Sequence, residues 1–91
     1  MAYWVYILYS ESTGLYYKGQ TGNLKDRIRR HNSGLEKATS KGKPWKLVWC
    51  TKKEDRLSAV CLERKLKNLT RERLERFILK HLDGFAGPDV P

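Results

Sequence analysis

The sequence predicts an α+β domain in which helices flank a small three-stranded antiparallel sheet, in the order β-β-α-β-α-α. Two observations support this prediction. Three runs rich in aromatic and β-branched residues have the composition of strands, and the segments between and after them carry apolar residues three and four apart, as helices do. A chain of 91 residues holds one small core. We therefore expect a single domain over residues 1–82 and a flexible tail over residues 83–91.

The first two strands are expected to form a hairpin. Residues 3–9 (YWVYILY) are continuously aromatic or aliphatic, which is typical of a central strand that is buried on both faces. Residues 15–20 (LYYKGQ) form the second strand. If the loop between them is residues 10–13, Tyr6 lies directly opposite Tyr17, and both side chains project from the same face of the sheet.

A short helix should follow over residues 24–32. Asn23 is a suitable N-cap, and Asp26 complements the positive amino-terminal end of the helix dipole. Gly34 is suited to the left-handed conformation that ends many helices. The basic and polar residues 37–43 (KATSKGK) then predict a flexible, solvated connection.

The second half of the chain should add a third strand and two helices. The strand is expected over residues 45–51, and the spacing of Thr51 and Glu54 is that of a capping box. The helix that this box would open runs over about residues 54–68, and Thr70 caps a last helix. Three residues of that last helix should close the core: Leu74, Phe77 and Ile78.

The composition favours a polyanionic partner. The chain has 19 Lys and Arg against 10 Asp and Glu, a net charge of +9 and a pI near 9.8. Nucleic acid is the commonest partner of such a surface. A membrane surface is disfavoured because no segment combines a broad apolar face with a strictly basic one. A solvated basic surface without a specific partner is the alternative.

The two cysteines are expected to be reduced thiols in the core. Cys50 and Cys61 each lie in an apolar run, and their spacing is not that of metal ligands or of a disulfide framework. The apolar residues 1–9 lack a basic leader and a small-residue cleavage site, and no run reaches the length of a transmembrane helix. These observations predict a cytoplasmic protein.

Glu63 is the most informative candidate for a functional residue. It lies on the apolar row of its helix, four residues after Ala59 and three before Leu66. A carboxylate in that position is costly to bury unless it is paired or binds a cation. It could form a salt bridge with one of the many arginines. It could equally hold a magnesium ion whose remaining ligands are a substrate phosphate and waters.

Tyr6 and Tyr17 are candidates because the hairpin places them on one face. Taken singly, each could be a core tyrosine with a hydrogen-bonded hydroxyl. Together, and near a metal ion or a guanidinium, a phenol can have its pKa lowered towards a value useful for taking a proton from water.

Arg27 and His31 lie four residues apart and form one row of the predicted helix. They could be a solvated helix face. Alternatively, arginine can bind a phosphate and stabilise developing charge, while histidine can orient a nucleophile and titrates near neutral pH. Five further residues are candidate nucleic-acid contacts, as cations or as a glycine that lets a phosphate approach: Lys18, Gly19, Arg30, Lys41 and Lys43.

These residues together resemble the GIY-YIG nuclease superfamily. The resemblance rests on the tripeptide VYI at residues 5–7, on YKG at residues 17–19, on Arg27 and His31, and on a glutamate, Glu63, in a later helix. Each motif is short, but their order and spacing match. The chain is most similar to the small stand-alone bacterial members, and the resemblance extends over nearly all of it.

The resemblance implies a fold, an activity and a set of roles. Members have a small antiparallel sheet flanked by helices and hydrolyse phosphodiesters with one divalent metal, Mg²⁺ or Mn²⁺, held by the glutamate that matches Glu63. It makes Tyr17 the general base or water-positioning group, with Tyr6 beside it. Arg27 would stabilise the transition state, and His31 would support the tyrosine hydroxyls or the nucleophile.

Three positions depart from the family pattern: Val5 stands where the first motif has its glycine, Lys18 stands where the second motif has isoleucine, and Gln20 follows the second glycine. Repair-type members have a lysine just after the second glycine, where this chain has Gln20, so a lysine-assisted activation of the tyrosine would need Lys18 or Arg27 instead. We therefore predict a metal-dependent endonuclease that cuts DNA with low sequence specificity, with the structure of the substrate (single-stranded, duplex or branched) left open. A nucleic-acid-binding module of the same fold, with little or no catalytic activity, is the main alternative. A domain that binds an acidic protein partner is a third.

Overall fold

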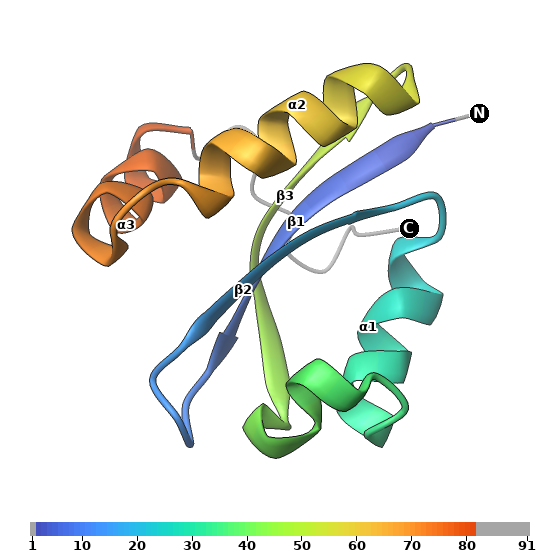
Figure 1. Cartoon of the computed structure of the whole chain (residues 1–91), viewed down its shortest axis with the longest axis vertical. Helices are drawn as coiled ribbons and strands as arrows, with labels where there is room; N and C mark the ends of the chain where they lie inside the picture. The colour runs from blue at the N-terminus through green and yellow to red at the C-terminus, as the bar shows by residue number, and fades with distance from the viewer. Residues whose placement is uncertain (1, 82–91) are drawn as a thin grey trace.

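The computed structural model describes residues 2–81 and shows one three-stranded antiparallel sheet (Figure 1). The strands are β1 (Tyr3–Ser10), β2 (Tyr16–Thr21) and β3 (Trp45–Lys53), and they lie in the order β2-β1-β3. The first strand is therefore central, as predicted, and its middle residues 5–8 are completely buried. The predicted tail, residues 83–91, lies outside the described residues.

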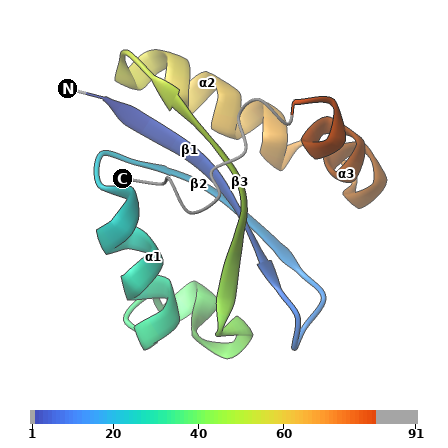
Figure 2. The ribbon, with the colours of Figure 1, turned by 180° about the vertical axis from the view of Figure 1, so that it is seen from behind.

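Within the described residues, three α-helices and one 3-10 helix cover the two faces of the sheet (Figures 1 and 2). α1 (Leu24–Ser33) and the 3-10 helix η1 (Lys37–Gly42) lie on one face. α2 (Arg56–Lys67) and α3 (Arg71–Lys80) lie on the other. The predicted order β-β-α-β-α-α is confirmed, with η1 as an addition.

None of the helices within residues 2–81 has the length and apolar character needed to cross a lipid bilayer.

The two faces of the sheet bury separate apolar clusters because successive side chains of a strand point to opposite sides. The face under α2 and α3 buries alternate residues of β1, such as Val5 and Ile7, with Leu66 of α2 and Leu74 of α3. The face under α1 and η1 buries Tyr6 and other residues. Phe77 and Ile78 pack at the border of the first cluster, so α3 closes this core as predicted.

Three of the predicted helix ends are confirmed. The Asn23 side chain accepts a hydrogen bond from the backbone N–H of Asp26 at 3.1 Å, and Gly34 adopts a left-handed φ of 81°. The Thr70 hydroxyl accepts from the backbone N–H of Arg73 at 3.3 Å.

The predicted capping box at the start of α2 is wrong. Asp55 caps this helix, and its carboxylate accepts a hydrogen bond from the backbone N–H of Ser58 at 2.8 Å. The reason is that β3 continues to Lys53, where it still pairs with β1. Thr51 lies inside that ladder, opposite Val5, so a helix cannot begin there.

The register of the hairpin differs from the predicted one by two residues. Tyr6 pairs with Gly19, and Tyr17 pairs with Leu8. The loop ends at Gly14, whose φ of 72° is left-handed and whose N–H donates to the Ser10 carbonyl at 2.7 Å. Because the shift is an even number of residues, Tyr6 and Tyr17 still project from the same face.

Residues 37–43 are not the flexible connection that their composition predicted. Residues 37–42 form η1, and Thr39 and Gly42 are buried. The Trp45 indole packs so closely on Gly42 that a Cβ at this position would collide with the ring. The Trp45 indole N–H also donates to the Thr39 carbonyl at 2.8 Å. A tertiary contact with β3 therefore orders a segment that is polar in sequence.

Both cysteines are free thiols, as predicted, but only one is buried. Cys50 lies in β3 under α1, and burial raises the pKa of its thiol to about 11. Cys61 is exposed, contrary to the prediction. It follows Ala59 by two residues, and Ala59 faces the sheet, so Cys61 points away from the core.

Candidate active site

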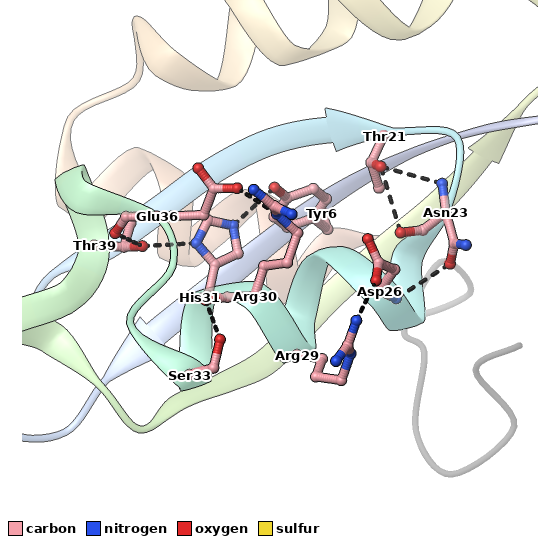
Figure 3. A network of polar contacts seen from close by, with 10 residues as sticks. All are labelled: Tyr6, Thr21, Asn23, Asp26, Arg29, Arg30, His31, Ser33, Glu36 and Thr39. Carbon is pink, nitrogen blue, oxygen red and sulfur yellow. Dashed lines mark hydrogen bonds and ion pairs between the residues drawn. The ribbon is translucent and has the colours of Figure 1, made fainter.

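The last turn of α1 places His31 in the centre of a polar cluster under the sheet (Figure 3). The imidazole is 1% exposed, and both of its nitrogens have partners. Nε2 lies 3.1 Å from the Tyr6 hydroxyl, and Nδ1 lies 2.7 Å from the Thr39 hydroxyl. His31 therefore links the central strand to η1.

The glycine opposite Tyr6 makes room for its ring. A Cβ on Gly19 would lie 2.6 Å from the Tyr6 hydroxyl oxygen and 3.1 Å from Cε2 of Tyr17. The motif glycine is thus required by packing between the two tyrosines. We expected Gly19 to let a phosphate approach the backbone, but on this face the Tyr6 side chain fills the space above it.

Tyr17 completes an aromatic cluster with Tyr6 and His31. Its ring centroid lies 4.8 Å from that of His31 and 6.3 Å from that of Tyr6. On another side it meets the Trp45 ring edge-on at 6.3 Å. Tyr17 is partly buried, whereas Tyr6 is fully buried, so Tyr17 is the more accessible of the two phenols.

The charges of Arg27 and Glu63 act on the Tyr6 hydroxyl. Burial raises the pKa of Tyr6, and Tyr17 and the Glu63 carboxylate raise it further, while the Arg27 guanidinium opposes them. The expectation that a nearby guanidinium would lower the pKa is wrong for Tyr6, because the cost of burying a phenolate outweighs the attraction. The contribution of Glu63 is the smallest of these, and Glu63 belongs to α2, the helix on the other face of the sheet.

Glu63 is a lone, partly buried carboxylate. Its side chain is 17% exposed, and its Oε1 lies 3.6 Å from the Lys67 ammonium, one helical turn away. The partner in this ion pair is a lysine rather than an arginine. Within residues 2–81, no group of three or more His, Cys, Asp or Glu side chains could hold a metal ion by itself.

The predicted nucleic-acid contacts do not form one patch. Lys18 pairs with Ile7 and lies on the other face of β2 from Tyr17, because strand residues alternate. It therefore cannot replace the family lysine beside Tyr17. Arg30 forms a 2.8 Å ion pair with Glu36. The two remaining lysines are exposed at the end of η1: Lys41 and Lys43.

Sequence reasoning missed the residues that hold the cluster together. Thr39 and Glu36 bind His31 and Arg30 of α1. Asn32 joins α1 to β3, since its side chain exchanges two hydrogen bonds with the backbone of Trp45. The polar composition of these segments is also that of an ordinary loop, so no pattern in the sequence indicates this role.

The motifs and their geometry agree with a known family. The model of the GIY-YIG catalytic domain matches residues 2–77. The chain belongs to the GIY-YIG family. Family membership indicates a nuclease-type function. The two tyrosine motifs from which the family takes its name lie on the adjacent strands β1 and β2.

Two relatives support this assignment. The chain is 32% identical over 77 residues to a UPF0213 protein of Photorhabdus laumondii, covering 84% of this chain and 74% of that protein. It is also similar to the solution NMR structure of the UPF0213 protein BH0048 from Bacillus halodurans, at 33% identity and a TM-score of 0.57. That match covers 99% of this chain and 92% of the other.

The contact between Gly19 and Tyr6 predicts the effect of adding one methyl group to a GIY-YIG glycine. We expect Gly19→Ala to lower the free energy of unfolding by about 1–3 kcal/mol, because the added carbon forces the Tyr6 ring to move. Gly22→Ala is the matched control, since nothing lies within 4 Å of its Cβ position, and it should change stability by less than about 0.5 kcal/mol. Urea denaturation measures both. Equal effects of the two substitutions would contradict this explanation of Gly19.

The buried imidazole predicts a pH dependence of stability. Burial lowers the pKa of His31, and the charges of Arg27 and Arg30 act in the same direction, whereas Glu36 opposes them. The unfolded chain therefore takes up a proton near pH 6.5 that the folded state resists. Stability should be fully present above about pH 6.5 and should decline as the pH falls through the lower pKa of the folded state.

Urea denaturation at a series of pH values between about 5 and 8 checks this pH dependence. His31→Asn should remove most of the slope between stability and pH in this range. His81→Asn, at an exposed position, should retain it. An unchanged slope in His31→Asn would show that another group is responsible.

Proposed function

We propose that this protein is a metal-dependent endonuclease that hydrolyses phosphodiester bonds of DNA with low sequence specificity. The observation that supports it best is the convergence of three side chains, Tyr6, Tyr17 and His31, within the reach of the charges of Arg27 and Glu63. Those five residues come from four different elements of a GIY-YIG domain. A packed core alone does not require a buried histidine and two phenols to meet.

In this proposal the two tyrosines have different tasks. Tyr17 is partly buried and is the general base or the group that positions the attacking water. Tyr6 is fully buried, and its raised pKa keeps its proton at neutral pH. Tyr6 therefore acts as a hydrogen-bonding group beside Tyr17, supported by His31.

Arg27 stabilises the charge that develops on the phosphate. It is partly buried on α1, one helical turn before His31, and its guanidinium is close enough to act on the Tyr6 hydroxyl. A guanidinium can bind two phosphate oxygens at once, and its strength as a charge donor increases where water is excluded.

The donor set suits a single Mg²⁺ or Mn²⁺. The Glu63 carboxylate is partly open to solvent, and its contact with Lys67 at 3.6 Å is longer than a hydrogen bond, so it can ligate a cation. Mg²⁺ in phosphate chemistry commonly takes one or two carboxylates and completes its octahedron with waters and substrate oxygens. When bound, the metal would supply Lewis-acid stabilisation of a phosphate oxygen.

The substrate is proposed to be DNA, with single-stranded and branched forms among the candidates. A net charge of +9 supports binding to a phosphate backbone of any sequence. Lys41 and Lys43 are exposed at the end of η1, on the same side of the sheet as Tyr17 and His31. In this proposal they hold the strand beside the cluster, and Arg30 contributes from the last turn of α1.

We expect three substitutions to reduce Mg²⁺-dependent cleavage of a labelled oligonucleotide. Glu63→Ala should abolish it while binding persists, since a metal ligand acts mainly in the transition state. Arg27→Ala should slow it by about 10²- to 10³-fold. Tyr17→Phe keeps the ring that packs on His31 and removes only the hydroxyl, so the fold should survive and activity collapse.

The control for Glu63→Ala is Glu72→Ala, which removes an exposed carboxylate from α3 and should cut at the wild-type rate. Single-stranded, duplex, flap and four-way substrates are compared in the same assay. If a folded Tyr17→Phe variant cuts normally, Tyr17 is a core tyrosine. If the wild type binds DNA but cuts no substrate, the chain is a nucleic-acid-binding module of this fold.

If the DNA strand lies beside η1, lysines near η1 should contribute more to DNA binding than lysines on the other face of the sheet. Replacing both Lys41 and Lys43 with alanine should weaken DNA binding and reduce the salt dependence of log K by roughly 0.7 to 0.9 for each phosphate that the protein no longer neutralises. Replacing Lys65 and Lys80, which lie on α2 and α3 across the sheet, removes the same charge and should have a smaller effect. Fluorescence anisotropy over a salt series measures both slopes. Equal slopes would mean that only the net charge matters.

A further inference from the structure

The hydrogen bonds around His31 have a defined direction. A neutral imidazole has one N–H donor and one acceptor nitrogen, and the burial that lowers its pKa keeps His31 neutral. The Thr39 hydroxyl lies 2.7 Å from Nδ1 and 3.3 Å from the backbone carbonyl oxygen of Glu36. A carbonyl can only accept, so a Thr39 hydroxyl that donates to Glu36 is left to accept from His31; Figure 3 shows both contacts.

The environment of the Tyr6 hydroxyl favours the same tautomer of His31, with the proton on Nδ1. Tyr6 is fully buried, and a buried O–H without an acceptor is costly. If Nδ1 carries the proton, Nε2 accepts from the Tyr6 hydroxyl at 3.1 Å, and every group in the chain of hydrogen bonds is satisfied. If Nε2 carried the proton, it would donate to Tyr6, and the Tyr6 hydrogen would have no acceptor among residues 2–81.

The backbone around Thr39 is fixed from two sides. Its carbonyl accepts from the Trp45 indole at 2.8 Å, and its N–H donates to the Glu36 carbonyl at 3.1 Å. The Glu36 side chain is held in turn by Arg30 of α1, the residue before His31. The hydroxyl of Thr39, which is 3% exposed, is therefore held in place without help from His31.

We propose that Thr39 is a positioning residue that fixes His31 as the neutral Nδ1–H tautomer, so that Tyr6 donates a hydrogen bond to Nε2 and its oxygen is left to accept one. The tautomer follows from the contacts alone, whereas its catalytic consequence rests on the proposed nuclease function. In the active site, the Tyr6 oxygen then accepts a hydrogen bond from Tyr17, the more accessible phenol. With the other tautomer, Tyr6 would receive a hydrogen bond from His31 and point its own hydrogen towards Tyr17.

Two substitutions at Thr39 distinguish the effect of its hydroxyl from the effect of its side-chain shape. Thr39→Val keeps the branched side chain but leaves the buried Nδ1–H without an acceptor, so His31 should lose its tautomer preference. Thr39→Ser keeps the hydroxyl and should restore it. Other charged or titratable groups near His31, namely Tyr6, Tyr17, Arg27, Arg30 and Glu36, remain the same in both variants.

The tautomer is measured by NMR of ¹⁵N-histidine-labelled protein at a pH where His31 is neutral. The chain has two histidines, so His81→Asn assigns the signals. We expect a protonated Nδ1 and an accepting Nε2 in the wild type and in Thr39→Ser, and loss of this pattern in Thr39→Val. A protonated Nε2 in the wild type would overturn the proposal even if Thr39→Val failed to fold. An unchanged pattern in folded Thr39→Val would also overturn it.

Cleavage kinetics test the catalytic consequence separately. With wild-type activity present, Thr39→Val should lower kcat by about 10- to 100-fold with KM little changed, the range seen when the partner that orients a histidine is removed. Thr39→Ser should recover most of this loss. A Thr39→Val variant with an altered tautomer and a normal kcat would overturn the positioning role. If the tautomer behaves as expected and the wild type cuts nothing, the nuclease proposal fails and the role of Thr39 in orienting His31 stands.

Discussion

The hydrogen bond between the Tyr6 hydroxyl and His31 joins the central strand to α1, and the geometry of the whole cluster depends on it. Both residues are buried, so the loss of either one leaves a buried polar group without a hydrogen-bond partner. Such a loss typically lowers the free energy of unfolding by about 1–3 kcal/mol. Tyr6 reaches His31 because the residue opposite it is Gly19. Tyr17 packs against the same imidazole from the neighbouring strand.

The two faces of the sheet differ in polarity. The face under α2 and α3 buries aliphatic and aromatic side chains from three strands and two helices, and its interior is apolar. The face under α1 and η1 contains the phenols, the imidazole and the arginine. Glu63 connects the two sides, because it belongs to a helix of the apolar face and its charge acts on Tyr6. Glu63 lies across the sheet from the basic residues of α1, and its carboxylate pairs at 3.6 Å with Lys67 of its own helix.

Several features could be predicted from the sequence because their cause is local. Asn23, Gly34 and Thr70 mark helix ends through their own backbone and side-chain chemistry, and these predictions are confirmed. The aromatic run of β1 is buried on both faces and central, as such a run must be. The shared face of Tyr6 and Tyr17 was predicted from an incorrect register. It survived because the error was an even number of residues.

The sequence by itself determined the family, the order of the elements, the excess of positive charge and which face of the hairpin carries the tyrosines. Only the tertiary structure decided that residues 37–42 form an ordered helix, that Thr39 holds His31, and that burial raises the pKa of Tyr6 instead of lowering it. The physical reason is common to all three. A threonine in a polar loop and a phenol in a strand have no fixed partner or dielectric environment until distant elements pack around them, and the contact of Trp45 with Gly42 brings those elements together.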